Sequence, residues 1–200
     1  MKKLLALSIT LVALFAFAIA APAARNADIP APPAIGAVID DFTLPDADGK
    51  NQALSSLEGT KGTVLIFVAT KCPISNAYNE RMEKLAQEYK AKGINVIGIN
   101  SNAAELAADV KAHAAANKLT FPILKDTGNK IADQLGATVT PEVFFLDASN
   151  KLMYRGRIDN ARDTSQVIAN DLRDALDAAL AGKPIAKTTA SAFGCNIKRA

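Results

Sequence analysis

The chain has 200 residues, with 23 Lys and Arg against 20 Asp and Glu, two cysteines and no tryptophan. Without Lys2 and Lys3 the formal net charge falls from +3 to +1, which leaves no basic patch for nucleic acid or for an anionic membrane surface. Two cysteines are too few for a disulfide-stapled miniprotein or for a four-cysteine zinc site, and we expect no metal site.

Residues 1–20 have the pattern of an export signal. A short basic start precedes an apolar run from Leu4 to Ile19, and Ala18-Ile19-Ala20 has the small-x-small pattern of a cleavage site, with Ala21-Pro22-Ala23 as a second candidate. The run is shorter than the roughly 20 residues that span a bilayer. We therefore expect cleavage, no membrane span afterwards, and a periplasmic or extracellular protein in which disulfides can form.

Two segments follow before the first buried strand. Residues 21–37 contain four prolines among alanines and predict an extended, mobile leader, so that the folded domain covers residues 38–182. Within that domain, Asp48-Gly49 is a turn signal between residues 41–44 and 52–54, which predicts an opening hairpin.

The middle of the chain alternates apolar strands with helices. Residues 63–68, apolar after Thr63, form a run typical of a strand buried on both faces, and residues 94–99 predict a second buried strand. Apolar side chains at helical spacing predict a helix over residues 75–92, and a second helix is predicted over residues 103–117. A short extended piece over residues 121–124 follows.

The last part of the chain predicts a short helix, two strands and a long helix. The short helix covers residues 131–135, and the strands at 142–146 and 152–157 are close enough in sequence to form an antiparallel hairpin. The long helix is predicted over residues 164–181, before a tail at 183–200 that carries Cys195. The apolar stripe of this long helix consists of Val167, Ile168, Leu172, Leu176 and Leu180.

This order of elements predicts an α/β fold. The strand–helix–strand unit over residues 63–99 requires parallel neighbours joined by a right-handed crossover. The later hairpin adds antiparallel strands. A mixed central sheet with helices on both faces is therefore expected.

Cys72 lies where the strand at residues 63–68 passes into a helix. Pro73 suits the first helical position, where a missing N–H costs nothing, so Cys72 falls at or near the N-cap. A thiolate there meets unpaired backbone N–H groups and the positive end of the helix dipole. The sequence therefore predicts a nucleophilic cysteine with a lowered pKa. The alternative is a buried structural cysteine.

Four segments carry a family resemblance. Residues 67–75 around Cys72, the hairpin at 42–50, the Thr-Pro segment at 140–147 and residues 156–159 resemble thioredoxin-fold redoxins, a group that includes the alkyl hydroperoxide reductase/thiol-specific antioxidant proteins and the periplasmic thiol reductases. The similarity covers about residues 35–181. It implies a thioredoxin-like fold, thiol redox chemistry on a peroxide or disulfide, an external thiol as reductant, and no cofactor.

Two departures from these relatives bear on the chemistry. The thiol reductases carry Cys-x-x-Cys, whereas the fourth position here is Ser75. Peroxiredoxins carry Pro-x-x-x-Thr-x-x-Cys, whereas Thr70 stands two residues before Cys72 and the proline is absent. The best interpretation is a peroxiredoxin-like outlier with antioxidant activity. The alternatives are a monothiol Cys-x-x-Ser exchanger of mixed disulfides and a non-catalytic binding module that holds an extended peptide.

Cys195 is the second candidate redox residue. It lies about 13 residues past the last predicted helix, so at about 3.3 Å per residue the tail reaches up to roughly 43 Å. A domain of this size has a radius of gyration near ~16 Å, which brings Cys72 within reach. Cys195 is therefore predicted to capture a sulfenic acid on Cys72 as a disulfide. A static disulfide and an unpaired thiol are the alternatives.

The resemblance adds candidates for substrate binding. Thr140-Pro141 resembles the family's cis-proline segment. A cis Pro141 would place the Thr140 backbone near the Cys72 sulfur, where a substrate chain pairs in related folds. The alternative is an ordinary loop proline.

Three further side chains are candidates for catalysis. Peroxiredoxins place an arginine on the strand that corresponds to residues 152–157, where it stabilises the thiolate and polarises the peroxide. Arg155 and Arg157 share one face of that strand, and either serves this role or is a solvated edge residue. Thr70 is a candidate to hydrogen-bond the thiolate or the peroxide.

Overall fold

The computed structural model of the protein describes residues 29–199. The predicted signal segment at 1–20 and the first residues of the predicted leader lie outside this range. Within it, no helix is long and apolar enough to cross a membrane.

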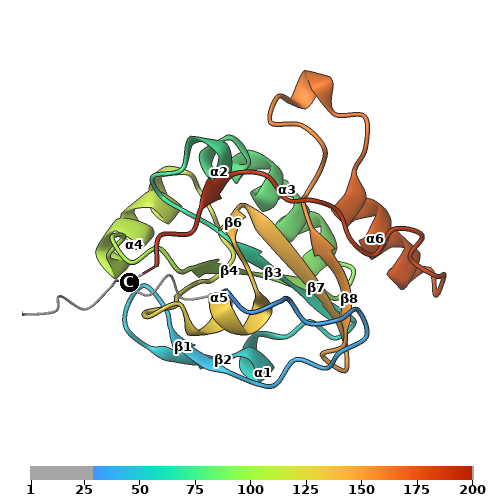
Figure 1. The fold of residues 1–200 in the computed structure, drawn as a ribbon, viewed down its shortest axis with the longest axis horizontal. Coiled ribbons are helices and arrows are strands. Elements are labelled where there is room, and N and C mark those ends of the chain that lie inside the picture. Colours follow the sequence, from blue (N-terminus) through green and yellow to red (C-terminus); the bar gives the residue numbers. More distant parts are fainter. Residues whose placement is uncertain (1–28, 200) are drawn as a thin grey trace, which may run out of the picture.

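A five-stranded mixed sheet forms the centre of the molecule (Figure 1). Its strands, in spatial order, are β5 (Ile123–Lys125), β4 (Ile94–Asn100), β3 (Gly62–Phe67), β7 (Glu142–Asp147) and β8 (Leu152–Gly156). β3 pairs in parallel with β4 and antiparallel with β7, and β7 forms a hairpin with β8. All six residues of β3 are buried. The predicted mixed sheet is confirmed.

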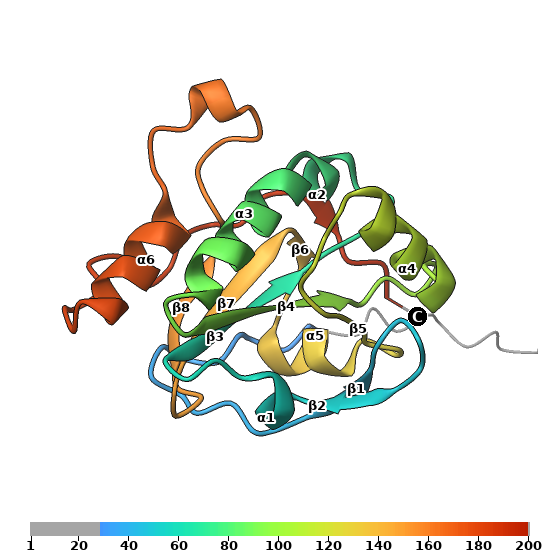
Figure 2. The same cartoon turned by 180° about the vertical axis from the view of Figure 1, so that it is seen from behind.

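Helices cover both faces of this sheet (Figure 2). One face carries α3 (Asn79–Lys90), α4 (Ala107–Ala116) and α6 (Asp171–Leu180). The other carries α1 (Leu54–Leu57), α5 (Lys130–Leu135) and the hairpin of β1 (Thr43–Pro45) and β2 (Asn51–Ala53). The core under α3, α4 and α6 is called the first core, and the core under α1, α5 and the β1–β2 hairpin the second core. Along β7, Val143 and Phe145 pack into the first core and Phe144 and Leu146 into the second, because successive side chains of a strand point to opposite faces.

The helix predicted over residues 75–92 is wrong as a single element. It consists of two helices, α2 (Pro73–Ala77) and α3, which meet at Tyr78. The Tyr78 amide donates to the Ser75 carbonyl at 3.0 Å, three residues back, and its hydroxyl donates to Asp159 at 2.7 Å. This hydrogen bond to a residue far along the chain holds Tyr78 at the junction of the two helices. A local sequence pattern gives no sign of such a distant contact, so it does not predict the break.

The helix predicted over residues 164–181 is wrong at its start. Only a 3₁₀ turn, η1 (Thr164–Gln166), forms there, and α6 begins later. The side-chain oxygen of Asn160 accepts hydrogen bonds from the amides of Ile168 and Ala169, both at 2.8 Å, which removes them from any helix. Ile168, placed in the apolar stripe by its spacing, is 91% exposed.

The end of the predicted leader lies against the domain. The Gly36 amide donates to the Leu152 carbonyl, and the Leu152 amide donates to the Ala37 carbonyl, both at 2.8 Å. Ile39 is then buried in the core. This part of the leader is therefore hydrogen-bonded to β8.

The C-terminal tail folds back across the molecule, and we call residues 185–199 the strap. In Figure 1 it runs in red from α6 past α2 and β6 (Val139–Thr140) to the C-terminus beside α4. It pairs in parallel with β8 at Thr189, and its short strand β9 (Cys195–Asn196) pairs antiparallel with β6. Near its end, the Lys198 carbonyl accepts from the Ala103 amide at 2.8 Å. The helix predicted from residue 103 is wrong at its start, since α4 begins at Ala107 after the N-cap Leu106.

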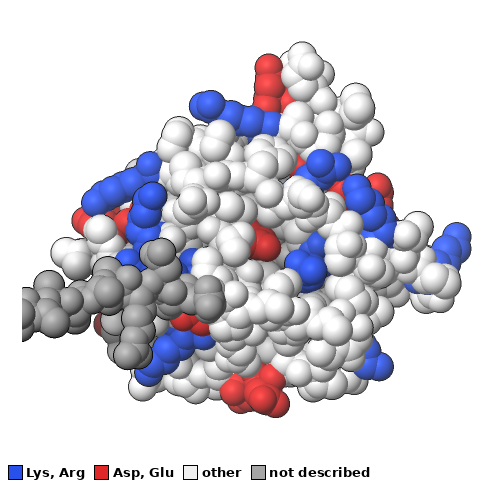
Figure 3. All heavy atoms as spheres, in the orientation of Figure 1, with Lys and Arg blue, Asp and Glu red and all other residues white. Residues whose placement is uncertain are grey.

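Charged side chains of both signs are scattered over the surface. On the face seen in Figure 3, Lys and Arg alternate with Asp and Glu around the rim, and neither sign forms a continuous patch. Across residues 29–199, no group of three or more His, Cys, Asp and Glu is placed to hold a metal ion.

Candidate active site

Cys72 occupies the N-cap of α2, as predicted. Its Sγ accepts a hydrogen bond from the Ser75 amide at 3.3 Å, and Pro73 follows at the first helical position. The side chain is 4% exposed. A sulfur in this position receives an N–H group that the start of a helix leaves without a partner. The local sequence therefore places the sulfur where its charged form is favoured.

The Thr140–Pro141 segment lies directly against this sulfur. The peptide bond between the two residues is cis, as the resemblance implies. The Cys72 thiol donates to the Thr140 carbonyl oxygen at 3.4 Å. Both Thr140 and Pro141 are buried. Thr140 is thus the backbone neighbour of the sulfur.

Cys195 approaches the same point from the strap. Cys195 pairs with Thr140 in the β6–β9 ladder, and the Thr140 hydroxyl lies 3.5 Å from the Cys195 carbonyl oxygen. Both cysteines are free thiols, and their side chains interact with each other. The tail therefore brings the second cysteine to the first without a disulfide bond between them.

The two thiols have pKa values shifted in opposite directions. Burial opposes ionisation of Cys72, but the Cys195 thiol and the Ser75 amide stabilise the thiolate and lower the pKa of Cys72. The hydrogen bond to the Cys72 sulfur, followed by burial, raises the pKa of Cys195. Cys72 is therefore the first of the pair to ionise, and Cys195 keeps a proton to donate to it.

Glu105 holds the loop that precedes Cys72. Its carboxylate accepts from the amides of Thr70 at 2.8 Å and Lys71 at 3.1 Å, and from the side-chain amide of Asn100 at 2.6 Å. Burial opposes its ionisation, yet these donors lower the pKa of Glu105, so the carboxylate stays charged. The Thr70 hydroxyl lies near this carboxylate and is buried without a hydrogen bond of normal geometry. Its predicted contact with a thiolate or a peroxide stays a prediction.

Ser75 has a structural role at the position where thiol reductases carry a second cysteine. It is fully buried, and its hydroxyl oxygen accepts from the Ala69 amide at 3.2 Å. Together with the hydrogen bond from its own amide to the Cys72 sulfur, this contact links Ser75 to Ala69 and Cys72, the residues on the two sides of the loop. A resolving thiol must therefore come from outside the motif.

The two candidate arginines are placed differently. Arg157 donates to Asp171 at 2.6 Å, and that carboxylate also binds Lys187 of the strap at 2.6 Å. Arg155 is half-buried and interacts electrostatically with Glu142. The contacts that most strongly lower the pKa of Cys72 come from Cys195, Ser75 and Thr140 and not from an arginine. The predicted roles of Arg155 and Arg157 stay predictions.

Glu105 and Glu142 were not among the candidates from sequence. Glu142 follows Pro141 and accepts from the amides of Thr138 at 2.8 Å and Val139 at 3.3 Å. Burial raises the pKa of Glu142. An acidic residue at the start of an otherwise apolar strand was the available signal for Glu142. Glu105 gives no comparable signal, because the amides it accepts from, those of Thr70 and Lys71, lie about 35 residues away.

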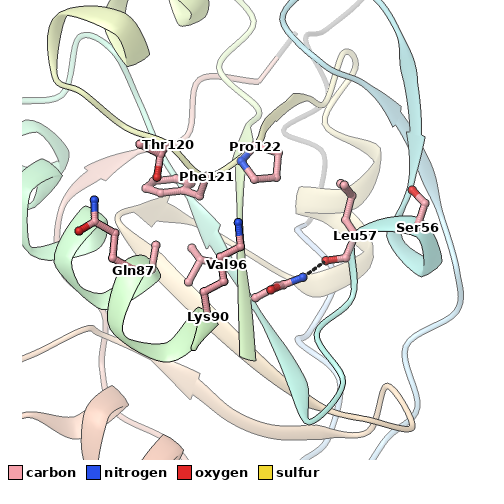
Figure 4. A pocket seen from close by; sticks show the side chains of 10 residues that line it. Ser56, Leu57, Gln87, Lys90, Val96, Thr120, Phe121 and Pro122 are labelled. Carbon is pink, nitrogen blue, oxygen red and sulfur yellow. Dashed lines mark hydrogen bonds between the residues drawn. The ribbon is translucent and has the colours of Figure 1, made fainter. Parts of the chain in front are cut away.

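A hollow of about 230 Å³ lies at the other end of the sheet (Figure 4). It is lined by Asn95 and Val96 at the start of β4, whereas Cys72 follows the end of β3, which runs parallel to β4. The Asn95 side chain in its wall donates to the Leu57 carbonyl at 2.9 Å. Lys90 is the titratable group of its lining. The hollow offers no thiol and is separate from the site.

Comparisons with known proteins agree with this geometry. The chain is 34% identical over 112 residues to the thiol-disulfide oxidoreductase ResA of Halalkalibacterium halodurans, a match over 56% of this chain and 62% of that relative. It is 31% identical over 126 residues to the chloroplastic peroxiredoxin Q of Triticum aestivum, over 60% of this chain and 57% of the relative. The match to ResA thus spans less than two thirds of that protein's length.

A solved structure gives a broader match. A hypothetical protein from Sinorhizobium meliloti is 35% identical, with a TM-score of 0.78, and the match covers 84% of this chain and 95% of that one. The thioredoxin-like fold expected from the resemblance is confirmed. Residues 35–155, which include Cys72 and the Thr140–Pro141 segment, match the model of the AhpC/TSA family. The chain belongs to the AhpC/TSA family, whose members are thioredoxin-like redoxins.

Proposed function

We propose that the chain is an exported cysteine-dependent oxidoreductase in which the Cys72 thiolate attacks a peroxide or a disulfide and Cys195 resolves the product. The observation that carries this proposal is the placement of the two thiols. Cys72 is held at a helix N-cap with a lowered pKa, and Cys195 contacts it from the strap. A thiolate is the nucleophilic form of cysteine, so this arrangement supports attack by Cys72.

With a peroxide ROOH, the Cys72 sulfur forms a bond to the terminal oxygen while the O–O bond breaks. Cys72 becomes a sulfenic acid, and the leaving alkoxide takes up a proton to give ROH. The Cys195 sulfur, as its thiolate, then attacks the Cys72 sulfur, and the departing hydroxide and the Cys195 proton leave as water. The sulfur pair is oxidised by two electrons and the peroxide is reduced by two.

With a disulfide RSSR, the Cys72 thiolate attacks one sulfur and releases RS⁻, which leaves a mixed disulfide on Cys72. Attack by Cys195 on the Cys72 sulfur releases the second RS⁻. If no second thiol acted, the mixed disulfide would pass to an external thiol, as in a monothiol exchanger. The name of the bacterial relative supports the disulfide reaction and that of the plant relative the peroxide reaction.

An external thiol completes the proposed cycle. It attacks the Cys195 sulfur of the Cys72–Cys195 disulfide, because Cys195 is half-buried while Cys72 is buried. Cys72 then leaves as the thiolate, which is favoured since it has the lower pKa of the pair. A second external thiol releases Cys195 and is oxidised with the first to a disulfide.

The proposal includes export, which rests on the pattern of residues 1–20. Expression in a Gram-negative host followed by cell fractionation tests it. The mature N-terminus is expected at Ala21 or Ala24, and full-length protein in the cytoplasmic fraction would contradict export.

Peroxide consumption and disulfide formation test the chemistry. With dithiothreitol as reductant, Cys72→Ser is expected to lower consumption of hydrogen peroxide or of a small disulfide by more than about 100-fold. Cys195→Ser is expected to keep the first step but to form no intramolecular disulfide, as read by mass spectrometry of tryptic peptides. Equal activity of Cys72→Ser and the wild type would contradict the proposal. A wild-type protein that forms no Cys72–Cys195 bond on oxidation would contradict the role of Cys195.

A further inference from the structure

The backbone edge next to the active sulfur is already filled by the chain itself. Within the described residues, β6 pairs with β9 of the strap. The Ile197 amide donates to the Thr138 carbonyl at 2.9 Å. On the same short segment, Glu142 accepts the amides of Thr138 and Val139. An extended polypeptide that adds a strand beside a sulfur needs a free edge of this kind. Here such a polypeptide would have to displace the strap.

Two glycines allow the strap to lie this close to the domain. A Cβ atom on Gly194 would overlap the Thr140 carbonyl group, with its carbon only 2.6 Å away. On the domain side, a Cβ atom on Gly156 would lie 2.8 Å from the Ala190 carbonyl carbon. Real Cβ atoms do not come this close to backbone atoms, so each position excludes any larger residue while the strap is docked.

Side chains on both sides of β9 hold the strap in place. Before it, the Phe193 ring packs edge-on against Tyr78, with ring centroids 6.2 Å apart. After it, Ile197 is 5% exposed in the second core. The Lys198 amide donates to Asn102 at 2.8 Å, and Arg199 forms an ion pair with Asp133 at 2.9 Å. These contacts reach the junction of α2 and α3, the loop before α4, and α5, so the strap is a docked element.

We propose that the docked strap acts as a selectivity barrier that restricts Cys72 to low-molecular-weight electrophiles and excludes extended polypeptides. A compound with a weak O–O or S–S bond needs only to reach the sulfur of Cys72, a residue that is 4% exposed. A polypeptide needs the Thr140 edge as well, and that edge is taken. Gly194 is the specificity-determining residue, because only glycine lets the strap pass over the Thr140 carbonyl. This inference rests on the proposed nucleophilic role of Cys72.

Two probes with the same reacting bond test the barrier. One is the mixed disulfide of cysteine with thionitrobenzoate, and the other is the same mixed disulfide on a cysteine in the middle of an extended ten-residue peptide. In either reaction Cys72 attacks the cysteine sulfur, the S–S bond breaks and thionitrobenzoate leaves as a coloured thiolate. All variants carry Cys195→Ser, so that the mixed disulfide on Cys72 persists.

The docked strap is expected to make the amino-acid probe react at least about 30-fold faster than the peptide probe, since only the fraction of molecules with an open edge accepts the peptide. Gly194→Ala, which lacks room beside Thr140, is expected to raise the peptide rate at least about 10-fold and to change the amino-acid rate less than about 3-fold. Ser191→Ala, an exposed strap residue, is the matched control and should keep the original ratio. Ile197→Ala releases the strap by a second route.

Equal rates for the two probes in the Cys195→Ser background would overturn the barrier. An unchanged ratio in both the Gly194 and Ile197 variants would overturn it as well. A failure of the proposed function gives a different result. Cys72 would then react with the amino-acid probe no faster than free cysteine does, whatever the ratio between the probes.

Discussion

Cys72 and Cys195 contact each other but are held in different ways. The Cys72 sulfur is fixed by residues next to it in sequence, through the Pro73 helix start and the Ser75 amide. Cys195 is fixed by a strap whose partners are spread from Tyr78 to Asp171. The nucleophile is therefore built into the domain, while its partner is delivered by the docked strap. Changes in the domain and in the strap should consequently have different effects.

Glu105→Ala is expected to have the largest effect on stability, because it removes hydrogen bonds within the domain that holds Cys72. It removes the acceptor of the Thr70 and Lys71 amides and the closer of the two acceptors of the Asn100 side chain, which keeps the Val68 carbonyl at 3.3 Å. A buried donor left unsatisfied costs about 1–3 kcal/mol, and these hydrogen bonds are buried at Asn100 and part-buried at Thr70 and Lys71, so we expect the free energy of unfolding to fall by about 3 kcal/mol. Urea denaturation measures it. Glu80→Ala, at an exposed pair with Lys84, is the control and should unfold as the wild type does.

Ile197→Ala should have a smaller and more local effect on stability, because it removes a buried side chain of the strap. Removing this buried side chain costs about 2 kcal/mol of docking free energy. We expect faster protease cleavage within residues 185–199 and little change in the midpoint of global unfolding. Ile131→Ala is a matched control, since Ile131 is also 5% exposed in the same core but lies on α5. It should lower the global midpoint instead. Identical behaviour of the two variants would mean that the strap unfolds only with the domain.

The same contrast explains which features could be predicted from sequence. The strand over residues 63–68 is apolar after Thr63, and Cys72 stands before Pro73, so this strand and the N-cap of α2 follow from adjacent residues. The mixed sheet follows from the order of elements and from the handedness of the crossover. A tail long enough to reach Cys72 was also visible from chain length alone.

The features that sequence missed depend on contacts between distant residues. Tyr78 ends α2 through Asp159, and Asn160 takes the amides that a helix over residues 164–170 would need. The loop before Cys72 is held by Glu105, more than 30 residues away. The need for glycine at position 194 becomes apparent only when the strap lies on Thr140. None of these pairings leaves a periodic pattern in the sequence.

A pH titration addresses the contact between the two regions and carries the smallest expected effect. Burial raises the pKa of Cys72, but the contact with Cys195 is the largest of the contributions that lower it. Cys195→Ala should therefore raise the pKa of Cys72 relative to the wild type. Conversely, Cys72→Ala should lower the pKa of Cys195, whose largest raising contribution is the contact with Cys72. Ultraviolet absorbance of the thiolate measures both, and a Cys72 pKa that does not move in Cys195→Ala would mean that the domain alone activates the sulfur.

The sign of this shift also fixes how stability depends on pH. The folded state lowers the pKa of Cys72, so ionisation of the thiol favours folding. That contribution is complete above the pKa of an unfolded cysteine and is lost as the pH falls through the folded value. The stability difference between the wild type and Cys72→Ala should therefore grow with rising pH across this window. In the Cys195→Ala background the same pH dependence should weaken, because the strap then contributes no thiol to the Cys72 thiolate.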